Sequence, residues 1–167
     1  MKGGIRVGGI FDVTCRDKHG NFKWRDQAKN LVVSEGLEHI LDVTLTGGTQ
    51  VDPWYIGLMS SSPSPATDDQ ISTHSFTEAT EYSESTRVTF VEGRTGVSVS
   101  NTGNLATFTL DADGTNIGGA FLASSEDAGG SSGILLCAAA FTGGDKSGDS
   151  GDKLEVTYTF TAADDGV

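Results

Sequence analysis

Proline, cysteine and histidine, the residue types on which turns, disulfide frameworks and metal sites often depend, are all scarce in this chain. Its 167 residues include only 3 Pro, 2 Cys and 3 His. His19, His39 and His74 show neither the HExxH pattern nor any paired-ligand spacing, so a zinc site is not expected. A G-x-S-x-G nucleophile elbow is also missing. The sequence therefore predicts no catalytic residue, no metal and no cofactor.

The two cysteines are far apart and do not form a motif. Cys15 and Cys137 each lie inside a segment that reads as a strand. A single pair at such a separation does not define a disulfide framework. We expect two buried free thiols.

Long apolar runs are absent as well. No stretch of about 20 apolar residues is present, and the start of the chain, Met1-Lys2-Gly3-Gly4-Ile5, lacks the apolar region of a signal peptide. These features predict a protein that is made in the cytosol and does not enter a membrane.

Positive charge is in short supply overall. The net charge is −12 and the pI is near 4.4, and phosphate binding requires Lys or Arg to replace counterions. Nucleic acid is therefore not an expected partner.

The few basic residues are concentrated near the N-terminus. Residues 1–30 hold seven Lys or Arg against three Asp, and the remainder holds four against twenty Asp or Glu. This basic segment is either a solvated hairpin or a strap that docks on the acidic body of a neighbouring subunit. The candidate interface residues are Arg6, Arg16, Lys18, Lys23 and Arg25.

What the chain does have is glycine, serine and threonine between short apolar segments, which is typical of strands joined by tight turns. Residues 5–29 predict a β-hairpin with its turn at Asp17–Asn21, because apolar and polar residues alternate on both sides of that turn. Gly3-Gly4 and Gly8-Gly9 predict a pliable arm ahead of the hairpin that orders on a partner.

One short helix is expected near residues 31–43. Asn30 is a candidate N-cap, and helical spacing places one set of apolar residues on a common face, namely Val33, Leu37, Ile40 and Leu41. Gly36 weakens this helix, so we expect it to depend on packing against a sheet.

The rest of the chain reads as strands and turns. The expected strands cover residues 54–59, 87–91, 97–100, 105–110, 117–123, 134–141 and 154–161. Residues 154–161 alternate, which predicts one buried and one solvated face, whereas the continuous apolar run 134–141 predicts a central strand covered on both faces, with a buried helix as the alternative.

This pattern predicts an all-β fold class. We expect residues 1–167 to form a single domain, a two-sheet antiparallel β-sandwich of jelly-roll type, with an immunoglobulin-like sandwich as the alternative.

Four segments resemble chemical motifs weakly. Residues 143–147 are similar to a phosphate-binding loop, but Asp145 stands where that motif needs Gly, so a plain connecting loop is favoured. Residues 111–116 and 144–152 are acidic enough to suggest calcium, yet the first does not match an EF-hand and both are ordinary turn chemistry. Glu78, Glu81 and Glu84 suggest a glycosidase pair or, as we favour, a solvated loop.

Two adjacent aromatic residues suggest either sugar binding or core packing. Trp54 and Tyr55 can stack on a sugar, but their place in an apolar strand favours packing between sheets.

The sequence as a whole resembles a family of small structural proteins of tailed bacteriophages, often labelled loosely as tail-fibre-like. The likeness runs from about residue 10 to the end of the chain and is carried by residues 30–32 with 35–37, 54–58, 117–122 and 141–146 leading to 154–160. None of these segments contains a catalytic signature.

The resemblance implies a capsid cement or decoration protein. Such a protein sits on the outside of the virion, contacts the major capsid protein, associates with itself as a dimer or trimer at two-fold or three-fold positions, and is synthesised in the host cytoplasm. The alternatives are a phage tail or receptor-binding component and a carbohydrate-binding β-sandwich. No ligand-binding residue is carried over from the family.

Overall fold

Short strands dominate the computed structural model, which describes residues 4–164. The strands are β1 (Ile5–Arg16), β2 (Phe22–Lys29), β3 (Leu31–Val32), β4 (Trp54–Met59), β5 (Glu78–Ala79), β6 (Val88–Phe90), β7 (Gly93–Thr95), β8 (Ser98–Ser100), β9 (Ala106–Thr109), β10 (Thr115–Ile117), β11 (Gly119–Ala123), β12 (Leu135–Ala140), β13 (Lys146–Gly148) and β14 (Lys153–Asp164). The helical part is α1 (Ser34–Leu41), followed by a π-helical turn, η1 (Asp42–Thr46).

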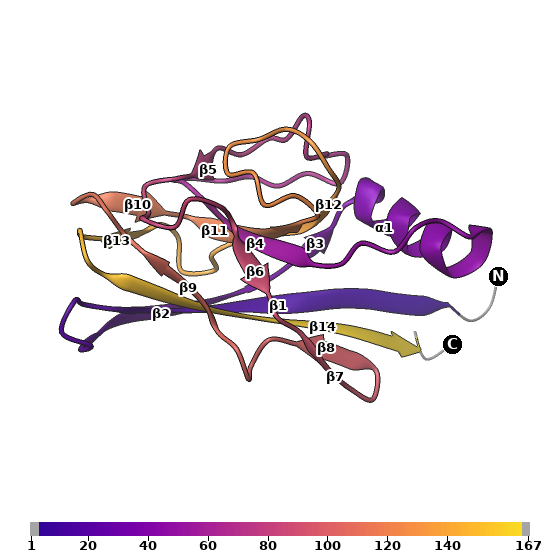
Figure 1. The fold of residues 1–167 in the computed structure, drawn as a ribbon, viewed down its shortest axis with the longest axis horizontal. Coiled ribbons are helices and arrows are strands. Elements are labelled where there is room, and N and C mark those ends of the chain that lie inside the picture. The colour runs from indigo at the N-terminus through magenta and orange to yellow at the C-terminus, as the bar shows by residue number, and fades with distance from the viewer. Residues whose placement is uncertain (1–3, 165–167) are drawn as a thin grey trace.

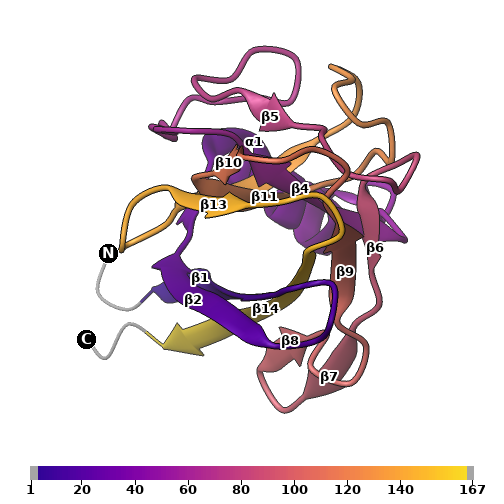
Figure 2. The same cartoon turned by 90° about the vertical axis from the view of Figure 1, so that its left-hand side faces the viewer.

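The strands form two facing antiparallel sheets. The first has the order β2-β1-β14-β8-β7, with β9 also paired to β14, and the second has the order β3-β12-β11-β4-β5, with β6 paired to β4. A separate two-stranded ribbon, β10-β13, lies at one end of the sandwich, as Figures 1 and 2 show. The all-β, antiparallel, sandwich-like prediction is confirmed, while the jelly-roll type stays a prediction.

The main core lies between the sheets. Leu154, Val156 and Tyr158 of β14 are fully buried and alternate with partly exposed neighbours, as their spacing predicted. The same core takes in Phe11 of β1, whose ring stacks on that of Tyr158 with centroids 4.2 Å apart. Burial of such side chains stabilises the fold by about 1.5–3 kcal/mol each.

A second, smaller core lies on the other face of the second sheet. Met59, Ile71, Phe76 and Phe121 belong to it, since the chain between β4 and β5 folds back over that face. Strand β12 is therefore covered on both sides, and the prediction of a central strand is confirmed over the helical alternative.

The predicted hairpin is confirmed, but the pliable arm ahead of it is not. Strands β1 and β2 pair around the turn after Arg16, and β1 also pairs with β14 over its whole length. Gly8 and Gly9 lie opposite Thr161 and Phe160 of β14. Ile5–Gly9 thus forms a strand within this chain; Gly3 lies outside the described residues.

The helix prediction was wrong at its start and in its apolar face. Leu31 and Val32 form β3, and α1 begins at Ser34 without a side-chain cap. Asn30 is not the cap, because its side chain instead joins two strands of the first sheet. Val33 is buried, but Leu37 and Leu41 are exposed, so half of the expected buried face points to solvent.

Gly36 explains how the helix packs so closely. A side chain at Gly36 would lie within 3 Å of the backbone of Leu136, so glycine permits direct contact between α1 and β12. Glu35 of the same turn accepts hydrogen bonds from the backbone N–H groups of Ile71 and Leu135. These contacts hold a short helix that its own propensity does not favour.

Several strand boundaries also differ. The expected strand 117–123 is divided at Gly118, whose backbone N–H donates to Met59 as the chain passes from β10 to β11. The two-residue strands β3 and β5 and the three-residue strands β7 and β13 were not predicted, because segments this short carry no readable alternation.

Candidate functional site

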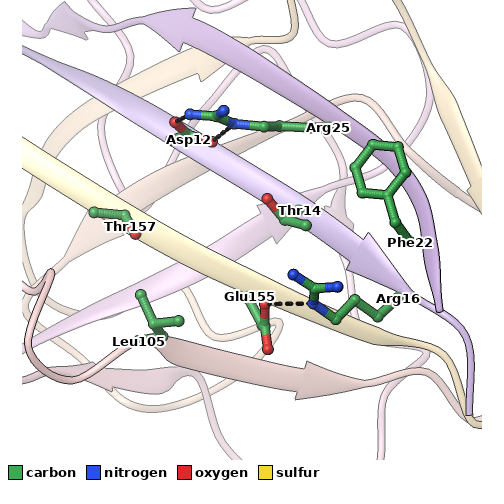
Figure 3. A pocket seen from close by; sticks show the side chains of 8 residues that line it. All are labelled: Asp12, Thr14, Arg16, Phe22, Arg25, Leu105, Glu155 and Thr157. Carbon is green, nitrogen blue, oxygen red and sulfur yellow. Dashed lines mark hydrogen bonds and ion pairs between the residues drawn. The ribbon is translucent and has the colours of Figure 1, made fainter. Parts of the chain in front are cut away.

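The basic side chains of the hairpin are engaged within their own chain. On the outer face of the first sheet, Arg16 Nε lies 3.2 Å from Glu155 Oε2, and Arg25 Nε donates to Asp12 Oδ1 at 2.7 Å. Figure 3 shows both pairs side by side along β1, β2 and β14. The hydrogen bond from Arg25 holds the pKa of Asp12 below its usual range, against a smaller opposing effect of burial.

Lys23 is tied to the loop that precedes β14. Its Nζ lies 2.9 Å from Asp149 Oδ2 and 2.5 Å from Asp152 Oδ2, and the Asp152 side chain is only 5% exposed. The hydrogen bonds to Asp152 and Asp149 raise the pKa of Lys23. A charge reversal at Lys23 would therefore disturb the fold as well as any intermolecular contact.

Lys18 and Arg6 differ from the other three. Both side chains are exposed and neither has an ion pair within residues 4–164. Of the five predicted interface residues, these two leave their charge available to a partner, and they lie at opposite ends of β1 and its turn.

The ion pairs border a shallow depression on the outer sheet face. Phe22 and Leu105 stand at its edge with about half of their side chains exposed, and Thr14 and Thr157 form its floor (Figure 3). It presents hydroxyl groups and paired charges, because Asp12, Arg16, Arg25 and Glu155 are all engaged in ion pairs with one another.

The acidic loops are bonded to one another. Asp113 Oδ1 accepts from the backbone N–H of Ser150, and Asp149 Oδ1 accepts from that of Gly114. Asp145 accepts from the backbone N–H of Ser62. Across residues 4–164, no group of three or more His, Cys, Asp or Glu side chains is placed to hold a metal ion.

The carboxylates of the suspected glycosidase segment do not form an acid pair. Glu78 lies within 2.9 Å of the Arg87 guanidinium at both oxygens, and both side chains are buried, so the prediction of a solvated loop was wrong for Glu78. Glu84 accepts from the backbone N–H of Thr109, and Glu81 from that of Thr80. Each carboxylate has a structural partner of its own.

Arg87 is the buried residue that sequence reasoning missed. Its guanidinium carbon lies 5.1 Å from the centre of the Phe121 ring, and it also donates to the carbonyls of Ser125 and Gly130. It is 1% exposed and donates four hydrogen bonds, two of them to carbonyls of the loop after β11, so it holds that loop in place.

The thiols are buried and free, as predicted. Cys137 Sγ donates to Tyr158 Oη at 3.2 Å, and Asn30 Nδ2 donates to the same oxygen at 2.7 Å. Burial raises the pKa of both Cys15 and Cys137 to about 11. Since the thiolate is the nucleophile, these groups are poorly reactive at neutral pH.

Four of the five most exposed large apolar side chains of residues 4–164 belong to elements at the end of the sandwich that carries α1 and the start of β1 (Figure 1); the fifth is Phe22. Leu41 is 57% exposed and Leu45 is 75% exposed on α1 and η1, while Ile5 of β1 and Val97 before β8 are exposed to a similar degree. Exposed apolar groups gathered in one region are typical of a contact surface.

An apolar groove of about 460 Å³ opens in the same part of the molecule. Ile40 and Val43 line it from the helical side and Val99 and Phe160 from the first sheet, with Trp54 between them. Trp54 is half-buried and edge-on to His39, with ring centroids 5.5 Å apart. The expected packing of Trp54 between sheets is thus only partial, because one side of its ring faces this groove.

No protein-family model and no curated protein matches the chain. Within residues 4–164 the structure has no helix with the length and apolar character that a membrane crossing needs.

Proposed function

We propose that this chain is a non-catalytic structural protein that binds the outside of a bacteriophage capsid as a cement or decoration protein. Its proposed partners are the major capsid protein and further copies of itself. The observation that carries the proposal is the contrast between the satisfied charges of the hairpin and the exposed apolar groups at the α1 end. Charged residues are typically depleted from the centre of a protein–protein contact and apolar ones are enriched there.

The acidic character of the chain fits this role. A net charge of −12 keeps a decorated particle soluble. A capsid offers the same site many times, so a contact that is weak for one copy becomes effective through symmetry and multivalency. The sequence resemblance to phage structural proteins supports the same proposal.

The direct test adds the purified chain to phage capsids that lack it and measures co-sedimentation and copies bound per particle. Hundreds of copies per particle support a shell protein. A handful supports the tail or receptor-binding alternative, and no binding at any concentration contradicts the proposal.

A pair of variants locates the surface. Leu41→Ser with Leu45→Ser should lower capsid affinity about tenfold or more, because it removes two of the exposed apolar side chains at the α1 end. The matched control is Leu105→Ser, which removes an apolar side chain of comparable exposure from the outer face of the first sheet. Equal capsid affinity of the double variant and the control would rule out the α1 end as the docking surface.

A further inference from the structure

Strand β1 has an open edge beyond the point where β2 leaves it. The last residue of β2, Lys29, lies opposite Ile10, and the chain then turns away to the second sheet. Figure 1 shows β1 and β14 continuing together past that point. Ile5–Gly9 thus pairs with β14 on one side only.

The direction of the backbone groups on this edge follows from one hydrogen bond. Asn30 N–H donates to the carbonyl of Gly9 at 2.9 Å, so Gly9 points its backbone groups away from β14. Backbone direction alternates along a strand, and Ile5 and Val7 therefore point the same way. Within residues 4–164, their N–H and C=O groups have no partner on that side.

This edge lacks the protection that the neighbouring strand has. Lys23, Arg25 and Lys29 place charges along β2, as natural edge strands commonly do. The open part of β1 reads Ile-Arg-Val-Gly, with one charge, and Ile5 is 79% exposed. An apolar strand edge with unused hydrogen-bonding groups fits another strand and little else.

We propose that two copies of this chain pair antiparallel through Ile5–Val7 of β1 about a two-fold axis at Arg6. Ile5 of each copy then exchanges two backbone hydrogen bonds with Val7 of the other, so all four unused N–H and C=O groups on each edge are satisfied. The first sheets of the two copies become one continuous sheet.

A second copy of this chain is the partner that fits the open edge of β1, because the edge is complementary to itself. A two-fold axis at Arg6 matches donors to acceptors without a shift, whereas an axis at Val7 would require Gly9, whose N–H and C=O are already bonded to Asn30. Isologous pairing of this kind also closes after two copies, because each copy uses the same part of β1.

The contact is small, which predicts a weak dimer in solution that is strengthened on a multivalent surface. In this respect the inference deepens the proposed function, since it supplies the surface for self-association. Arg6 of one copy lies opposite Arg6 of the other, and these like charges are screened by salt. Edge pairing therefore tightens as salt rises, whereas a basic strap on an acidic neighbour weakens.

The closing experiment uses Arg6→Cys in the full chain. Opposed residues at a non-hydrogen-bonded position have Cα atoms about 4.5 Å apart, which is within disulfide range. Under mild oxidation at micromolar concentration, Arg6→Cys should become a disulfide-linked dimer, while Lys18→Cys in the exposed turn remains largely monomeric. Cys15 and Cys137 are buried and should not react. Equal rates of cross-linking for the two variants would overturn the proposal.

A second pair of variants tests the backbone contact. Val7→Pro removes an N–H that faces solvent within the monomer, a place where an edge strand tolerates Pro, and Val7→Thr keeps the N–H. Sedimentation velocity at rising concentration should show the dimer for the wild type and Val7→Thr, with at least tenfold weaker association for Val7→Pro. Unchanged association of Val7→Pro would contradict edge pairing. If Val7→Pro fails to fold, Ile5→Lys, which places a charge on the open edge, takes its place with the same expected loss.

Amide hydrogen exchange provides an internal control. The Val7 amide should gain protection as protein concentration rises, while the Gly8 amide, which points to β14, should be protected at every concentration. Failure of these solution measurements refutes the dimer alone, because capsid binding by the α1 end is measured separately. Absence of capsid binding with an intact dimer refutes the proposed function alone.

Discussion

The two ends of this sandwich differ in whether their surface groups find partners within the chain. At the end with the β1–β2 turn, Lys23 is shared between Asp149 and Asp152, and the acidic loops bond to each other's backbone. At the end with α1, Leu45 and Ile5 are exposed and part of the β1 edge lacks a partner. The ion pairs at the first end are formed within one chain, whereas the exposed side chains and the strand edge at the second end have no partner within residues 4–164.

This difference shows that three of the five basic residues proposed as interface residues already have acidic partners within their own chain. Basic residues in an acidic chain suggest an interface. Arg16, Lys23 and Arg25, however, form ion pairs with acidic side chains of their own sheet or loops. Ion pairs with exposed partners contribute little, at about 0–1 kcal/mol each. The groups left without a partner within residues 4–164 are the charges of Arg6 and Lys18, the exposed apolar side chains and the open part of the β1 edge.

The largest expected effect lies at the junction between the two ends, where β2 leaves β1. A side chain at Gly9 would lie 2.5 Å from the carbonyl oxygen of Thr159 and 2.7 Å from the Tyr158 ring. Gly9→Ala should therefore lower the free energy of unfolding by about 3 kcal/mol, the upper end of the usual cost of overpacking. Urea denaturation measures this change.

Gly8→Ala is the matched control for that prediction. The added methyl group at Gly8 has only an ordinary contact, 3.7 Å from Asn30 Oδ1. Its stability should change by less than about 1 kcal/mol. Similar losses for the two variants would show that the junction is not held by the close approach of Tyr158.

An intermediate effect is expected at the charged end. Lys23→Met removes the cation beside Asp152, whose side chain is almost buried, and should cost about 1–2 kcal/mol in the free energy of unfolding. Lys18→Met, on the same hairpin but without an ion pair, should change stability by about 0.5 kcal/mol or less. If both variants behave alike, the charged end is not closed by Lys23.

The smallest expected effect is a change in how the free energy of unfolding depends on pH. The hydrogen bond from Lys23 lowers the pKa of Asp149 in the folded chain. A carboxyl with a lowered pKa stabilises the fold above its unfolded pKa of about 4, and this contribution is lost as the pH falls through the folded value. Between pH 5 and pH 2, the wild type should lose stability more steeply than Lys23→Met. Parallel curves from urea titrations across this range would contradict the assignment.

The structure of a segment could be predicted from the sequence where its pattern of apolar and polar residues was long enough. The alternation of Leu154, Val156 and Tyr158 and the unbroken run at 134–141 each specified a strand and its environment, because burial on one or both faces leaves a direct trace in the residue pattern. Arg87 left no such trace. Its burial depends on Glu78 and on two carbonyls of the loop after β11, which only the folded chain brings together.

The candidate contact surfaces also depend on contacts that the local sequence pattern does not reveal. Sequence reasoning found the basic residues of the hairpin but not their partners, since Glu155 and Asp152 lie more than a hundred positions away. Helical spacing was read as a buried face, yet only part of α1 meets β12, and Leu41 remains exposed. The exposure of an apolar residue depends on what packs against it, which a local pattern does not state.

By itself the sequence determined the class of the fold, the turn of the first hairpin and the burial of both thiols, because these follow from local alternation and turn chemistry. Tertiary structure alone decided which charges are satisfied and where β1 is left without a neighbour. The open part of β1 depends on the route of the chain after Asn30, which crosses to the second sheet instead of continuing along β1. That route is set by packing between residues distant in sequence, so it has no signature in the order of the residues.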